Sequence, residues 1–220
     1  MASPPLRDAY VHVREGRVAG LGPASERPRS ARLVERDLGR VVLTPGFVNA
    51  HTHLELSHLA GAVSGADGFV PWIEEQLRVR AERPTGDVEP ALRQAIRELS
   101  DAGTVALADV SNSLAAVDAL VDSTLHALVL HEVLGFDPSR AEAVAAQMRE
   151  TRESVRARIA QRGGDAAERV TVAVAAHAPH SLSRELFALL LAEGIRSIHL
   201  AESKAEDVFL AQDEVLFAVE

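Results

Sequence analysis

The chain alternates short apolar runs with longer segments in which apolar residues recur every three or four positions. The short runs predict buried strands, and the 3.6-residue period predicts amphipathic helices. After residue 44 the predicted strands are 46–50, 104–110, 125–134, 170–176 and 197–200, and the predicted helices are 69–81, 90–102, 114–120, 139–162, 184–193 and 207–220. Apolar strands separated by helices indicate a parallel sheet that is covered on both faces. We therefore expect an α/β fold.

The first 45 residues follow a different pattern. Residues 8–20 predict two short strands around a turn at Glu15-Gly16, and residues 31–38 and 41–43 predict further short strands. We expect a small β-sandwich segment over residues 1–45 and a (β/α)8 TIM-type barrel over residues 46–220. A closed barrel of this type needs roughly 250 residues, and the second segment provides only about five βα units. The expected barrel is therefore partial.

Charge and residue usage limit the partners and the kinds of site. Asp and Glu number 32 against 23 Lys and Arg, and the net charge of −9 argues against nucleic acid or an anionic membrane as partner. There are no cysteines, so a transition metal would be held by histidine and carboxylate. We see no signal peptide and no apolar run of membrane length. We expect a cytoplasmic protein that acts on a small molecule, and a homodimer stays open.

Histidines follow three of the predicted strands. His51 and His53 end the first strand, and residues at i and i+2 of a strand point to one face, where they can chelate one ion. His177 follows the fourth strand, and His199 ends the fifth, with Glu202 three residues later. Ligands of α/β folds bind at the carboxyl ends of the strands, so this coincidence indicates a metal site. The alternatives are solvated loop histidines, a glutamate that caps the next helix, and a structural histidine.

Three stretches carry a family resemblance. PGFVNAHTHLE resembles the first-strand motif of the amidohydrolase superfamily, and HAPHSLS and IHLAES resemble later motifs of its cytosine deaminase/chlorohydrolase branch. The resemblance implies that His51, His53 and His199 bind one divalent metal ion, Zn or Fe. It implies that Glu202 is the proton shuttle and that His177 contacts the substrate. In this branch the ion activates water for attack on a ring carbon, and ammonia leaves.

A narrower resemblance concerns the substrate. HTHLELS followed by FVPWIEEQL, and also HEVLGF, resemble the aminodeoxyfutalosine deaminase group, which deaminates an adenine-type ring in a route to menaquinone. It implies that Trp72 lies in a lid beside the first strand, and the alternative is a core anchor. Glu55 would line the pocket or brace its edge, Glu132 lies near the mouth without an assigned role, and His58 is interpreted as a loop histidine.

The chain also departs from the family pattern. The sixth-strand histidine and the eighth-strand aspartate have no match, so we expect a C-terminally truncated barrel with poor activity or none. Two alternatives to an aminopurine nucleoside deaminase remain. One is another deaminase or chlorohydrolase of the branch, acting on guanine, triazine or adenosyl compounds. The other is a non-catalytic remnant that binds metal or pairs with a fuller homologue.

Overall fold

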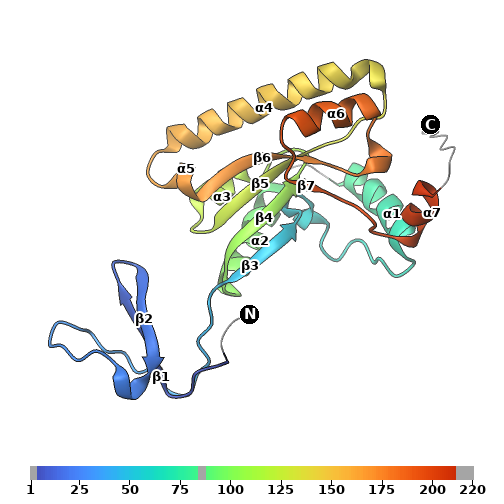
Figure 1. Ribbon diagram of the computed structural model, residues 1–220. Coiled ribbons are helices and arrows are strands. Elements are labelled where there is room, and N and C mark those ends of the chain that lie inside the picture. The colour runs from blue at the N-terminus through green and yellow to red at the C-terminus, as the bar shows by residue number, and fades with distance from the viewer. Residues whose placement is uncertain (1–3, 84–87, 212–220) are drawn as a thin grey trace. The chain divides into compact units, whose positions relative to one another are not determined.

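The computed structural model describes residues 4–83 and 88–211 (Figure 1). The chain divides into two compact units, Met1–Thr44 and Pro45–Glu220. The first unit contains one antiparallel hairpin, in which β1 (Ala9–Arg14) pairs with β2 (Arg17–Pro23). Glu15 and Gly16 both have positive φ, as a tight two-residue hairpin turn requires.

The expected strands at 31–38 and 41–43 are not formed. Beyond the hairpin, the first unit contains the short helix η1 (Ala24–Glu26) and irregular chain. Val34 and Val42 are 98% and 89% exposed, so their apolar side chains pack against no sheet in the described residues. Within the described residues this unit therefore contains one hairpin, because strands need a partner ladder as well as apolar composition. The β-sandwich segment over residues 1–45 stays a prediction.

The second unit is built on a five-stranded parallel sheet in the order β3-β4-β5-β6-β7 (Figure 1). The strands are β3 (Phe47–Thr52), β4 (Thr104–Ser111), β5 (His126–Val133), β6 (Val170–Ala176) and β7 (Ser197–Ile198). Each strand pairs with the next one in the chain, which is the winding of a (β/α) barrel. All five expected strands are present, and the fold is a partial (β/α) barrel.

Helices connect these strands. They are α1 (Phe69–Glu82), α2 (Val88–Asp101), α3 (Val117–Asp122), α4 (Ala141–Arg162), α5 (Ala166–Arg169), α6 (Arg184–Ala192) and α7 (Lys204–Leu210), with short 3-10 turns η2 (Leu54–Leu59), η4 (Pro138–Arg140) and η5 (Pro179–Ser181). The helix expected at 139–162 starts after η4, where the Asp137 carboxylate accepts from Ser139 N at 2.9 Å, and ends at Gly163. The last expected helix is formed over Lys204–Leu210, and residues 212–220 lie outside the described residues.

Side chains alternate between the two faces of the sheet. Leu107, Val129 and Val172 belong to a core that includes helix residues such as Leu92 and Ile159. The opposite face carries a smaller apolar cluster formed by Val110, Leu130 and Ala175, with Ala108 and Ala173 beside it. Because the period of a strand is two, the positions that continue this inner face at the carboxyl ends are 112, 132, 177 and 199. All four carry polar side chains.

The described part of the chain contains no helix that is long and apolar enough to cross a membrane.

Candidate functional site

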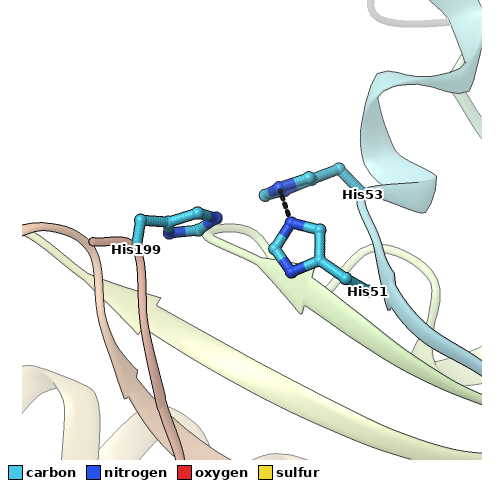
Figure 2. A group of neighbouring side chains, drawn as sticks. All are labelled: His51, His53 and His199. Carbon is cyan, nitrogen blue, oxygen red and sulfur yellow. Dashed lines mark hydrogen bonds between the residues drawn. The ribbon is translucent and has the colours of Figure 1, made fainter. Parts of the chain in front are cut away.

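Three imidazoles converge at the carboxyl ends of β3 and β7. Figure 2 shows the rings of His51, His53 and His199 turned toward one another. The Nε2 atoms of His51 and His53 lie 3.1 Å apart. The ring centroid of His199 lies 5.0 Å from the ring centroid of His51 and 5.5 Å from that of His53. One ring nitrogen from each of the three residues lies within 4.8 Å of the others. The fold therefore brings together residues that are about 150 positions apart in the chain, as the carboxyl-end rule predicts.

The surroundings of His199 determine which of its nitrogens is free. Its Nδ1 lies 3.1 Å from the backbone oxygen of His177 and 3.0 Å from Oε1 of Glu132. Both neighbours are acceptors, so in the neutral ring Nδ1 carries the hydrogen and Nε2 has the lone pair. The interaction with Glu132 raises the pKa of His199, although burial opposes the rise. That Nε2 lies 4.0 Å from Oε1 of Glu202.

This arrangement fits a divalent transition metal. Two imidazole nitrogens on one tetrahedral zinc, each about 2.0–2.1 Å from it, are about 3.3 Å apart, close to the 3.1 Å between His51 and His53. Ligand imidazoles must be neutral. Burial, with His51 and His199 adjacent, lowers the pKa of His53 and favours its neutral form, although Glu132 opposes this. Three histidine ligands with a further open position are typical of catalytic zinc sites.

Glu132 is the group to which the sequence assigned no role. It is the second-last residue of β5 and is 5% exposed, and its Oε2 accepts from Nδ2 of Asn112 at 3.0 Å. Burial raises the pKa of its carboxyl, but the interaction with His199 and the nearby His177 bring the pKa below the usual range. HEVLGF and the strand-end position were the available sequence signals. They did not indicate that the partner is His199.

Glu55 braces the loop after β3. It is 5% exposed, and its carboxylate accepts from Ser111 Oγ at 2.7 Å, Asn112 N at 3.2 Å and Ser113 N at 3.0 Å, and also from the Ser113 hydroxyl. Burial raises the pKa of Glu55, but the Ser113 and Ser111 bonds lower it more. Of the two expected roles, pocket lining or edge bracing, these contacts favour the brace. They leave little of the carboxylate for a substrate.

The other expected residues lie in three settings. His177 is near the three converging histidines, with its ring centroid 5.4 Å from that of His199 and its Nδ1 2.8 Å from Ser181 Oγ. Glu202 is exposed beside the same ring. Trp72 lies on α1, and its ring centroid is 5.9 Å from the ring centroid of Phe69. It is partly buried, and no described contact joins it to the three histidines.

A second combination of donors occurs next to the first. Glu132, His177 and His199 also place one ligand atom each within 4.8 Å of one another. Both combinations need His199. The His199 nitrogen with a recorded contact to Glu132 is Nδ1, which also faces the His177 oxygen and therefore carries hydrogen in the neutral ring. The first combination is the better supported metal site.

Known proteins share both the sequence and the fold. The model of the amidohydrolase family matches residues 42–211. The chain is 30% identical over 190 residues to the aminodeoxyfutalosine deaminase of a Nitratiruptor species, and the match covers 84% of this chain and 45% of that protein. It is 30% identical over 172 residues to the 5-methylthioadenosine/S-adenosylhomocysteine deaminase of Halobacterium salinarum, covering 69% of this chain and 38% of the relative.

Solved structures agree at the level of the fold. Guanine deaminase from C. acetobutylicum, with bound guanine, superposes with a TM-score of 0.61 at 17% identity, covering 91% of this chain and 50% of that one. Helicobacter pylori aminofutalosine deaminase in complex with methylthio-coformycin gives 0.59 at 23% identity, covering 77% and 40%. The chain spans less than half the length of the two curated relatives above. With the family match extending over most of its residues, the chain belongs to the amidohydrolase family.

Proposed function

We propose that this protein is a metal-dependent aminohydrolase that removes the amino group of an aminopurine nucleoside. The observation that carries the proposal is the convergence of His51, His53 and His199, with Glu202 next to the free nitrogen of His199. The relatives named as deaminases of adenosine-type compounds support the reaction class.

Each residue has a role in this proposal. His51, His53 and His199 would hold the ion, which when bound supplies Lewis acidity and lowers the pKa of a water ligand toward about 7. Glu202 takes a proton from the attacking water and gives it to the leaving amine, so that the ring carbon gains oxygen and ammonia departs. Its exposed carboxylate, with Oε1 4.0 Å from Nε2 of His199, suits this transfer. His177, whose ring lies next to that of His199, would contact the substrate.

The proposed substrate is an aminodeoxyfutalosine-like nucleoside, which would place the protein in a route to menaquinone. The support is the resemblance in HTHLELS, FVPWIEEQL and HEVLGF, together with a relative of that name at 30% identity. Methylthioadenosine, adenosylhomocysteine and 5'-deoxyadenosine are the alternatives that other relatives' names suggest. Trp72 would belong to the substrate side of α1.

The test has a metal arm and a turnover arm. The purified full chain is loaded with zinc or iron, and bound metal is measured by elemental analysis beside a His51→Ala/His53→Ala variant. His126→Ala is the matched control, because His126 is exposed at the other end of β5. We expect one ion per chain, lost only in the double variant. A folded chain without a bound ion would overturn the metal site.

Ammonia release is then followed with the adenosine-type compounds above and with guanine. Release from at least one adenosine-type compound supports the proposal. Because the partial barrel is expected to be poorly active, release is followed at high chain concentration over many hours and compared with the His51→Ala/His53→Ala background. A chain that binds the ion but releases no ammonia above that background contradicts the aminohydrolase role for this chain and supports a non-catalytic metal-binding protein.

A further inference from the structure

We propose that Glu132 is a positioning residue that orients His199 and holds its hydrogen on Nδ1, and that Asn112 supports Glu132 in this role. The inference rests on the proposed function, since it concerns the same metal site. It assigns a role to a buried carboxylate that the mechanism above does not use.

His199 needs such support because its strand is short. β7 has two residues and pairs with β6 only at Ala175↔Ser197 and Ala176↔Ile198, so His199 lies just beyond the ladder. Its backbone N donates to the His177 oxygen at 2.8 Å, which fixes the main chain. The ring itself is held at Nδ1, by that same oxygen at 3.1 Å and by Glu132 at 3.0 Å. By contrast, His51 extends from the six-residue strand β3.

Asn112 holds both the side chain and the backbone of Glu132. Its side chain and its backbone oxygen both accept from Nδ2 of Asn112, at 3.0 and 3.2 Å. The backbone N of Asn112 donates to Glu55 at 3.2 Å, and Glu55 lies in η2 just after His53. A connected series of polar contacts therefore runs from the β3 loop, across the ends of β4 and β5, to His199. It joins the two parts of the chain that supply the metal ligands.

The chemistry favours a carboxylate in this position. A metal-binding imidazole that donates its other N–H to a carboxylate is fixed in one tautomer and becomes a stronger base. Glu132 places Oε1 3.0 Å from Nδ1 of His199, with the two side chains buried at 5% and 9% exposure. Among the described residues this contact is an ion pair, and Oε1 makes no hydrogen bond of regular geometry, so a small rotation of the carboxylate would complete the interaction. Loss of such a partner typically weakens metal binding about 10–100-fold.

The tautomer of His199 is measured first, in the metal-free full chain, by imidazole ¹⁵N NMR. The pH is kept well above the ordinary imidazole pKa of about 6.5, and His199→Ala identifies the signals. We expect hydrogen on Nδ1 in the native chain and a shift toward Nε2–H in Glu132→Leu. Glu132→Gln keeps an acceptor and should lie between the two. An unchanged tautomer in Glu132→Leu would show that the His177 oxygen suffices, and would overturn the proposal.

Zinc affinity is measured next, by competition with a chromophoric chelator. We expect a loss of about 10–100-fold for Glu132→Leu, a smaller loss for Asn112→Ala, and no further loss when the two are combined. Glu185→Gln, the same neutralisation as Glu132→Gln at an exposed site on α6, should bind like the native chain. Equal zinc affinity in Glu132→Leu and the native chain would contradict the proposal.

One further result would assign Glu132 differently. If His51→Ala/His53→Ala still bound an ion, and Glu132→Leu removed it, Glu132 would be a ligand in the second combination of donors, and the positioning role would be wrong. The tautomer measurement needs neither metal nor substrate, so the positioning role and the proposed function fail separately.

Discussion

Asp109 allows a quantitative test of how the site is supported. It is fully buried in β4, where Oδ1 accepts from Leu54 N at 2.8 Å and thus holds the residue after His53. Its Oδ2 has no hydrogen-bond partner among the residues that the structure describes. Burial raises the pKa of its carboxyl from 3.8 to about 7; the Leu54 bond opposes the rise, and the charge of Glu55 adds to it.

Proton linkage determines whether Asp109 raises or lowers the stability of the fold as pH rises. Between pH of about 4 and 7 the folded state keeps a proton that the unfolded state releases, so this group lowers stability as pH rises through that range. The difference between 3.8 and about 7 corresponds to about 4 kcal/mol, at about 1.4 kcal/mol for each tenfold change. Asp109→Asn keeps an acceptor for Leu54 and cannot titrate. Its unpaired amide adds a cost of about 1–3 kcal/mol, which is independent of pH.

The assay is urea unfolding of the metal-free chain from pH 4 to 8, for the native protein and the variant. We expect the free energy of unfolding of Asp109→Asn, relative to native, to rise by up to about 4 kcal/mol between pH 4 and 7 and then to level off. Other titrating groups are common to both proteins and cancel in the difference. Asp101→Asn, at an exposed position, controls for the change of charge. Parallel curves for native and Asp109→Asn would refute the reasoning.

Three further predictions concern the brace, the entry to β3 and the proton shuttle. Glu55→Gln should lower the free energy of unfolding by about 2 kcal/mol, because hydrogen bonds to a charged acceptor contribute about 1.5–3 kcal/mol; an unchanged urea midpoint would contradict the bracing role. A Cβ at Gly46 would overlap the Val105 side chain, which is 48% exposed and can shift only in part, so Gly46→Ala should lower the free energy of unfolding by about 1 kcal/mol. In the Val105→Ala background, Gly46→Ala should lower the free energy of unfolding much less than it does in the native chain. If the losses of the two single variants simply added in the double variant, the overlap would be contradicted. Glu202→Gln should retain the metal measured by elemental analysis while ammonia release falls at least about 100-fold; full release would exclude Glu202 as the shuttle.

Local pattern was enough to predict the sheet and the meeting of three histidines at its edge. The apolar runs before His51, His177 and His199 became β3, β6 and β7, each close to its expected bounds. The carboxyl-end rule then placed these histidines at one edge of the sheet. Apolar composition alone failed at residues 31–43, where no strand formed.

The partners of the buried acids could be known only from the fold. Glu55 meets Ser111 across 56 residues, and Glu132 on β5 meets His199 just after β7, with β6 between the two strands. Hydrophobic periodicity is a property of neighbouring residues, so it determines which segments become strands and which side chains share a face. Which acid meets which donor depends on strand order and register, and these are fixed only when distant segments pack together. The sequence by itself therefore determined the barrel elements and the histidine set, and tertiary packing decided that Glu55 braces a loop and that Glu132 contacts His199.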